Sequence, residues 1–303
     1  MTRTPRPDIY QTITAKIVVA VEASPGDPVM PWQRGGFKAV LPSNAVTGHD
    51  YRGINILSLW ITALERGYEA GLFATYKQWA SVGAQVRQGE SAAPIVFYRQ
   101  LEIARDGEGA DEGEIATVRM ARGYWVFAAE QVDGFTAPSA LAPNPIDRIA
   151  AADAYVGATG ASVVSGGNRA CYRPSTDTIH MPDEARFFDG DGRTRSEAYY
   201  SVLGHELVHW TSAEARLKRT LGERFGDDAY AMEECCAEIG AAFLCARLGI
   251  AHEPHPDHAR YVHHWLKVLK QDARAIFAAA ARAQEAVTYL DGLQSPPAQQ
   301  SAA

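Results

Sequence analysis

Apolar side chains recur every three or four residues in several stretches of the chain, which is the spacing of one helix face. This pattern predicts helices over residues 8–23 and 54–70, and Gly71 is the expected stop of the second. Residues 201–210 follow a capping-box sequence and predict a third helix. A fourth is expected over residues 228–249, which begin with a possible Asp cap and end with a Gly stop.

Shorter runs rich in Val, Ile, Tyr and Phe predict strands. Residues 94–98 and 124–127 are expected to pair, and residues 102–114 between them, with six acids, one base and three glycines, suggest a solvated hairpin tip. Residues 162–164 predict another strand. Residues 171–182 predict a second hairpin, and its later arm, just before the third helix, is expected to border a cleft and accept a peptide by strand addition.

A proline-rich segment at residues 136–145 is interpreted as a linker. Before it, residues 1–135 predict a small α+β domain. After it, residues 146–292 predict a mainly helical domain with a short sheet, and residues 293–303 are expected to be a disordered tail. The predicted fold class is therefore α+β, with two domains.

Length and composition agree with two globular domains. The chain has 303 residues, of which 47% are hydrophobic and 21% charged, and this excludes a disordered protein as the overall class. No apolar run approaches the length of a membrane span, and residues 1–7 lack a signal-peptide hydrophobic region, so we expect a cytoplasmic protein without membrane partners. The four cysteines form no spaced metal pair, and disulfides are not expected.

His205 and His209 lie four residues apart on the third predicted helix, and Glu206 directly follows the first of them. Because four residues make slightly more than one helical turn, both imidazoles project from one face and can reach a single ion. Glu206 lies beside them and can handle a proton. The spacing is typical of a zinc helix.

Zinc in a hydrolase normally takes three protein ligands and leaves the fourth position for water. The fourth predicted helix offers Glu234 and Glu238 on a face that is otherwise small and apolar. Burying these carboxylates without partners would cost several kcal/mol, whereas a divalent ion and the free imidazole nitrogen of its ligand would satisfy both. The adjacent Glu233 is a rival for the ligand position.

His205-Glu206-x-x-His209 followed by Glu234-x-x-x-Glu238 resembles the gluzincin metallopeptidases. The resemblance implies that His205, His209 and Glu234 bind zinc. It also implies that Glu206 is the catalytic base and that Glu238, which replaces the more usual aspartate, orients a histidine ligand. The ligand types favour Zn²⁺, and Mn²⁺ or another divalent ion fits the same set.

Residues 31–55 mix turn-forming residues with aromatic, basic and amide side chains. Side chains of these kinds stack on the bases of single-stranded DNA and contact its phosphates. The candidate DNA-binding residues are Trp32, Arg34, Lys38, Asn44, Tyr51, Arg52 and Asn55. From these residues alone, a surface turn without DNA-binding function, whose aromatic side chains pack into the interior, is an equally good interpretation.

Charge alone does not identify a nucleic-acid-binding protein. Residues 28–99 hold seven Lys or Arg against four acids, but the whole chain has a net charge of −7, and a dedicated binder usually shows a larger basic patch. Residues 41–55 and 79–90, however, resemble the amino-terminal domain of the ArdC antirestriction proteins, which is shared with certain plasmid TraC primases. That family domain binds single-stranded DNA. The residues that carry the resemblance are Leu41 to Gly48, Tyr51, Ile54, Asn55, Trp79, Gly83, Ala84, Arg87 and Glu90.

The resemblance to ArdC covers nearly the whole chain, including residues 201–210 and 230–250. It implies an antirestriction protein that binds single-stranded DNA, protects plasmid DNA entering a new host, and carries a zincin-like metallopeptidase domain. A host restriction protein or another protein would be the peptidase substrate. Two alternatives remain open: a non-enzymatic DNA shield with a structural or vestigial metal site, and a peptidase whose first domain binds protein.

Three further groups have competing interpretations. His180, on the later arm of the second hairpin, is a fourth ligand, a substrate contact or, more commonly for such a residue, a structural histidine. Residues 216–226 hold four bases, which either contact phosphate or form an exposed connector. Residues 252–264 hold five histidines near prolines, and this irregular spacing gives no defined metal geometry.

Overall fold

The computed structural model describes residues 8–23, 29–33, 39–69, 71–104, 115–137, 145–190, 193–220, 228–252 and 258–294. Several predictions concern residues outside these ranges, wholly or in part. They are those for residues 1–7, the loop at 34–38, the hairpin tip at 105–114, the linker at 138–144, the basic segment at 221–226, the histidine segment at 253–257 and the tail at 295–303. Within the described ranges, no helix is both long and apolar enough to cross a membrane.

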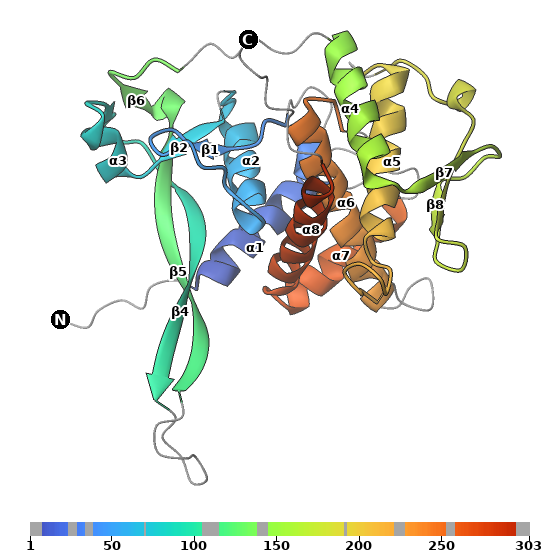
Figure 1. The fold of residues 1–303 in the computed structure, drawn as a ribbon. Coiled ribbons are helices and arrows are strands. Elements are labelled where there is room, and N and C mark those ends of the chain that lie inside the picture. The colour runs from blue at the N-terminus through green and yellow to red at the C-terminus, as the bar shows by residue number, and fades with distance from the viewer. Residues whose placement is uncertain are drawn as a thin grey trace, which may run out of the picture.

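The first domain is built around a long antiparallel ribbon, which projects from the body of the molecule (Figure 1). Strand β4 (Ala93–Ala104) pairs with β5 (Ile115–Ala128), so that Ile95 stands opposite Tyr124. This confirms the predicted pairing. Two short strands, β1 (Ser43–Asn44) and β2 (Leu72–Ala74), complete the sheet in the order β1-β2-β5-β4.

The remaining elements of the first domain flank this sheet. They are α1 (Ile9–Glu22), η1 (Pro31–Gln33), α2 (Ile54–Arg66), α3 (Tyr76–Ser81), β3 (Gln85–Val86), η2 (Ala129–Gln131) and β6 (Val132–Asp133). The predicted stop of α2 at Gly71 was wrong. The helix ends at Gly67, which adopts a left-handed φ of 68° and donates its N–H to the carbonyl of Ala63.

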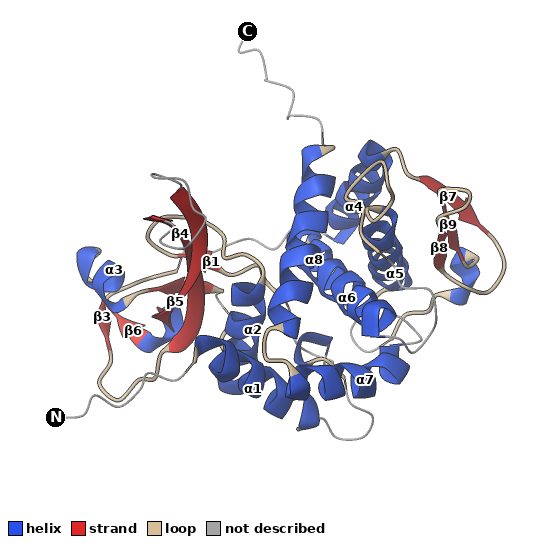
Figure 2. Cartoon of the chain, turned by 90° about the horizontal axis from the view of Figure 1, so that it is seen from below, coloured by secondary structure: helices blue, strands red, loops and turns tan. Residues whose placement is uncertain are grey.

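The second domain combines a small sheet with a helical bundle (Figure 2). Its elements are α4 (Pro145–Thr159), β7 (Ser162–Ser165), β8 (Cys171–Arg173), β9 (Thr178–Met181), η3 (Glu184–Arg186), α5 (Arg195–Trp210), α6 (Asp228–Leu248), α7 (His258–Gln271) and α8 (Ala275–Gly292). The sheet order is β7-β9-β8, with β8 and β9 antiparallel as predicted and β7 parallel to β9. The α+β class with two domains is confirmed.

One hydrophobic core joins the two domains. It contains buried residues of α1 and α2 together with residues of α5, α6, α7 and α8. Trp60 of α2 packs against Phe243 of α6, with ring centroids 5.7 Å apart. The first two helices therefore form part of the scaffold that holds the helices of the second domain.

Helices α5 and α6 approach each other closely at Gly240. A Cβ atom at this position would lie 2.6 Å from Cγ2 of Val208, a distance that real Cβ atoms essentially never show. Only glycine lets the two helix backbones come so near without a shift of Val208. This close packing brings the polar residues of α5 and α6 face to face.

Candidate metal centre

Helix α5 presents the two histidines of the motif toward α6. Its start is defined by the predicted capping box. The Thr194 hydroxyl accepts from the N–H of Glu197, and the Glu197 carboxylate accepts from the N–H of Thr194. His205 and His209 then lie one turn apart, and their Nε2 atoms are 3.1 Å from each other. Both side chains are buried.

Glu234 of α6 faces the same point. One of its carboxylate oxygens lies 3.5 Å from Nε2 of His205, and the other lies 3.5 Å from Nε2 of His209. Donors at about 2.0–2.1 Å from a tetrahedral ion stand roughly 3.3 Å from one another. The three donors therefore fit a divalent ion, and among the described residues they are the group of His, Cys, Asp and Glu able to hold one.

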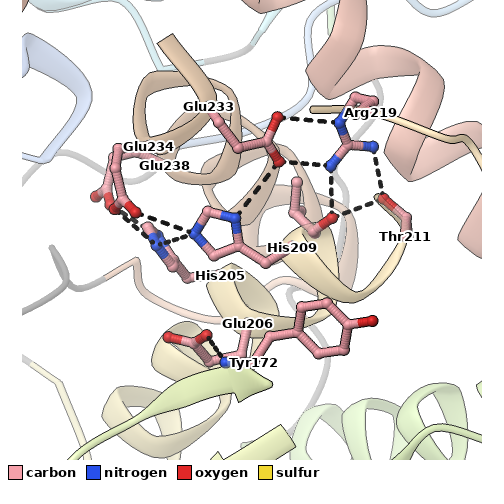
Figure 3. A network of polar contacts seen from close by, with 10 residues as sticks. Tyr172, His205, Glu206, His209, Thr211, Arg219, Glu233, Glu234 and Glu238 are labelled. Carbon is pink, nitrogen blue, oxygen red and sulfur yellow. Dashed lines mark hydrogen bonds and ion pairs between the residues drawn. The ribbon is translucent and has the colours of Figure 1, made fainter. Parts of the chain in front are cut away.

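Each histidine also has a carboxylate behind it. Oε2 of Glu238 lies 3.1 Å from Nδ1 of His205, and Oε1 of Glu233 lies 3.4 Å from Nδ1 of His209 (Figure 3). A carboxylate in this position orients the ring and leaves Nε2 directed at the ion. Glu233 thus lies on the Nδ1 side of His209, whereas Glu234 lies on the Nε2 side, where a ligand must be.

Arg219 anchors Glu233. Its Nε and Nη2 atoms lie 3.2 and 2.9 Å from the two Glu233 oxygens, and its remaining N–H groups donate to the Thr211 hydroxyl and the Val208 carbonyl. Residues 216–226 had been expected to contact phosphate or to lie exposed. Arg219 instead turns inward, and Arg216 lies over the Trp210 ring and pairs with Asp177.

The carboxylates determine the charge state of the imidazoles. Burial alone would lower the pKa of His205 and His209, but Glu234 and Glu238 raise the pKa of His205 well above its ordinary value. Glu234 and Glu233 raise the pKa of His209 to about 9. The pKa of Glu234 lies far below its usual range, because the facing imidazoles outweigh the effect of burial. The site therefore favours positive charge between these side chains.

Glu206 lies next to the small sheet. Its Oε2 accepts a hydrogen bond of 2.7 Å from the backbone N–H of Tyr172 in β8 (Figure 3). The prediction that the later hairpin arm borders the site as an open strand was wrong, because β9 is paired on both sides. The earlier arm, β8, is the edge strand and contacts Glu206.

The other histidines whose side chains the structure describes do not belong to the group of three donors. His180 lies in β9 opposite Cys171 and is not a member of the metal-binding group. His252 is buried with Nε2 at 3.6 Å from Oε1 of Glu238, on the far side of that carboxylate from His205. Of the remaining histidines in residues 252–264, His255 lies outside the described ranges and His263 is exposed.

Comparisons with known proteins agree with this geometry. Residues 7–127 match the N-terminal domain of anti-restriction factor ArdC, and residues 150–282 match a zincin-like metallopeptidase. A crystal structure of the metal-free antirestriction ArdC protein from plasmid R388 is 37% identical, covers 95% of this chain and 98% of that one, and has a TM-score of 0.76. The chain belongs to the ArdC antirestriction family. This membership confirms the resemblance inferred from the sequence.

Other relatives of this ArdC-family chain differ in length. The uncharacterized protein y4eC of Sinorhizobium fredii (strain NBRC 101917 / NGR234) is 43% identical over 298 residues, which cover 97% of this chain and 95% of that protein. DNA primase TraC of Escherichia coli is 33% identical over 299 residues, which cover 94% of this chain and 20% of the primase. An Mn(II)-bound structure of the R388 ArdC protein is 34% identical, with 95% and 98% of the two chains covered and a TM-score of 0.74.

The ArdC-type loop places most of its described candidate DNA-binding residues in the interior. Trp32 is buried beside Trp60, at 6.4 Å between ring centroids. Tyr51 is buried too, and its hydroxyl donates to the Phe73 carbonyl and accepts from the Asn44 amide. The amide of Asn55 bonds both backbone groups of Val96 in β4. Trp32 thus packs on α2, and Tyr51 and Asn55 bond to backbone groups of the sheet.

Arg52 is the exposed member of the set. Its guanidinium donates to the Thr288 hydroxyl of α8 at 2.9 Å. It lines a cavity of about 390 Å³ between the loop and helices α6 and α8, together with His49, Asp50 and Arg247. Arg34 and Lys38 lie outside the described residues.

Proposed function

We propose that this chain is a divalent-metal-dependent peptidase joined to a single-stranded-DNA-binding domain, and that it protects plasmid DNA entering a new host from restriction. The observation that carries the peptidase half is the convergence of two imidazole Nε2 atoms and the Glu234 carboxylate, at separations of 3.1 and 3.5 Å. The Mn(II)-bound structure of the R388 relative supports a divalent ion as the cofactor. Zinc is the ion that two imidazoles and one carboxylate favour.

In this proposal His205, His209 and Glu234 hold the ion. When bound, such an ion supplies Lewis acidity, which polarises a carbonyl and lowers the pKa of water. Glu206 takes the proton of the attacking water and passes it to the leaving amine. A substrate peptide adds to the open edge of β8, which brings its backbone beside Glu206. The substrate is a protein, and a host restriction protein is the candidate of this class.

Glu206→Gln tests the peptidase. Glutamine keeps the size of the side chain and an oxygen for the N–H of Tyr172, but it cannot take a proton. We expect cleavage of an unfolded protein substrate to fall by a factor of about 100 or more, while the metal content per chain, measured by mass spectrometry, stays unchanged. Glu214→Gln, at an exposed acid after α5, serves as the matched control and should cleave normally. Equal cleavage by the Glu206→Gln variant would refute the proposed base.

A second candidate function is a DNA shield that needs no hydrolysis. It is favoured by the hydrogen bond that engages Glu206 with the backbone of β8 in this conformation. Transfer of an unmodified plasmid into a restricting host separates the two functions. If protection depends on peptidase activity, the Glu206→Gln variant should no longer protect the plasmid from restriction. If the chain is a DNA shield, this variant should protect the plasmid as the parent does.

The DNA half is tested separately with single-stranded oligonucleotides. Phosphate contacts release counterions, so binding should weaken steeply as the salt concentration rises. A first domain that binds protein instead would show no such affinity for oligonucleotides. Arg52 remains a proposed contact because it is exposed at the loop cavity. The buried Trp32, Tyr51 and Asn55 would act by shaping the loop.

A further inference from the structure

The projecting ribbon carries large apolar side chains in water. Phe97 of β4 and Met120 of β5 are both 52% exposed. The exposed Arg122 stands opposite Phe97, and the half-buried Tyr124 follows on the side nearer the body of the molecule. We call Phe97, Met120, Arg122 and Tyr124 the ribbon face. A solvent-facing strand surface is normally polar, so exposed aromatic residues at adjacent positions indicate a surface that a ligand covers.

The register shows that these residues share one side of the ribbon. In the antiparallel ladder Phe97 stands opposite Arg122, and two residues further along β5 Tyr124 stands opposite Ile95. Residues directly opposite each other, and residues two apart on one strand, lie on the same face. The rings of Phe97 and Tyr124 meet edge to face at 5.5 Å, and the guanidinium of Arg122 lies 5.3 Å from the Tyr124 ring. The surface is thus ordered before any ligand binds.

The same side of the ribbon is buried nearer the body of the molecule. There Ile95 and Val126 pack with Leu59 of α2, whereas Phe97 and Met120 extend beyond that helix into the projecting part. The opposite side of the ribbon rests on α1, where a Cβ on Gly123 would lie 3.1 Å from Cδ1 of Ile9. The ribbon is therefore supported from one side near Gly123, and the side that carries Phe97 and Met120 faces solvent. Two further aromatic residues, Tyr98 and Trp125, are each 50% exposed on the supported side.

Charge identifies the kind of partner. The paired residues of this part of the ribbon whose side chains the structure describes, 93–98 and 120–126, contain Arg122 and no Asp or Glu, although the whole chain has a net charge of −7. Glu102 lies further out along β4. A ligand for this surface must therefore offer flat apolar groups and negative charge together. The unpaired bases and the phosphates of single-stranded DNA have this combination, whereas the bases of a duplex are stacked inside and cannot reach an aromatic ring.

We propose that the ribbon face binds single-stranded DNA, with bases stacked on Phe97 and Tyr124 and a phosphate beside Arg122. This inference deepens the proposed DNA-binding function by moving its main contact from the loop at residues 31–55 to the ribbon. It also explains how the domain binds DNA although Trp32 and Tyr51 are buried.

Fluorescence anisotropy with a labelled oligo(dT) of about 20 nucleotides tests this surface on the full chain. We expect Phe97→Ala to raise the dissociation constant roughly tenfold or more, because a stacked base is lost. Arg122→Gln should weaken binding and reduce the slope of log affinity against log salt by about one, as expected for one lost phosphate contact. Phe97→Trp should retain the affinity of the parent chain. A duplex of the same length should bind more weakly than the single strand.

Phe188→Ala is the matched control, since Phe188 is an aromatic residue of the second domain that is 75% exposed. It should bind the oligonucleotide as the parent does, and thermal unfolding should show that Phe97→Ala is folded. If the parent chain binds no oligonucleotide, the DNA-binding function itself fails. If the parent binds and Phe97→Ala and Arg122→Gln bind equally well, the ribbon proposal is overturned while the function stands. A change in self-association without a change in DNA affinity would assign the ribbon face to contacts between copies and would also overturn the proposal.

Discussion

Replacing Arg219 by leucine should strongly destabilise the protein, although this residue lies outside the three donors of the metal centre. The side chains of Arg219 and Glu233 are only 7% and 2% exposed, and without the guanidinium the Glu233 carboxylate keeps, of its partners among the described residues, only His209 beside it, at 3.4 Å. Removing one member of a buried ion pair costs about 3–5 kcal/mol. The hydrogen bonds from Arg219 to Thr211 and to the Val208 carbonyl are lost as well. We therefore expect a loss within that range.

Urea unfolding of the metal-free protein, followed by tryptophan fluorescence in the presence of a chelator, measures this loss. In a parallel thermal unfolding experiment, a change of this size in the free energy of unfolding should lower the melting temperature by roughly 10 °C or more. The double variant Arg219→Leu/Glu233→Leu removes both charges and should recover most of the stability, because no carboxylate is then left unpaired in the interior.

Lys218→Gln is the control for this experiment. Lys218 neighbours Arg219 in the same connector, but it is exposed and pairs with the exposed Glu214, so its replacement should change stability by no more than about 0.5 kcal/mol. A loss below about 1 kcal/mol in Arg219→Leu, or a double variant less stable than the single one, would refute the reasoning that a buried ion pair supports Glu233.

Two further predictions concern the packing and support of the metal centre. Glu238→Ala removes the carboxylate behind Nδ1 of His205, and isothermal titration should show metal affinity reduced about 10–100-fold in a folded protein; unchanged affinity would show that this carboxylate does not orient the ligand. Gly240→Ala places a methyl group against Val208 and should cost about 1–3 kcal/mol in urea unfolding. Adding Val208→Ala should recover part of that loss, and a stability of Gly240→Ala equal to the parent's would contradict the observed closeness of α5 and α6.

The metal helix is the part of the site that the sequence predicts best, because its information is local. A capping box, a four-residue spacing and an adjacent carboxylate all act within one helix, and the structure shows each of them in α5. Predicting the ligand on α6 required one more inference. Glu234 and Glu238 lie on an otherwise apolar helix face, and two buried acids need a positively charged partner. Whether Glu233 or Glu234 faces the Nε2 atoms depends on how α6 is rotated about its axis relative to α5, and hydrophobic periodicity does not give that rotation.

The inward turn of Arg219 is an example of what sequence patterns do not show. A segment with four bases is usually exposed, and only the fold reveals that Arg219 meets a buried carboxylate and the last turn of α5. The loop at residues 31–55 is similar, since its composition indicates residue types but not which of them face inward. Trp32 is an interior residue because it packs on Trp60 of α2, and Asn55, in the first turn of α2, is interior because it faces β4.

The domain division was predicted from a proline-rich segment, and the family matches fall on either side of it. The hydrophobic core shared by the two domains was not predictable in the same way. The sequence shows that α1 and α2 have apolar faces, but it does not show which helices those faces contact. The ribbon face was missed for a related reason. Apolar residues occupy both sides of β4 and β5, so their alternation does not tell which side the body of the molecule covers.

Anomalous diffraction from crystals grown with Mn²⁺ tests the central claim most directly. The account predicts one strong peak per chain, within coordination distance of Nε2 of His205, Nε2 of His209 and the Glu234 carboxylate, with Glu238 and Glu233 still behind the two rings. No peak between these three side chains, or a Glu234 carboxylate turned away from the imidazoles in the presence of the ion, would contradict it.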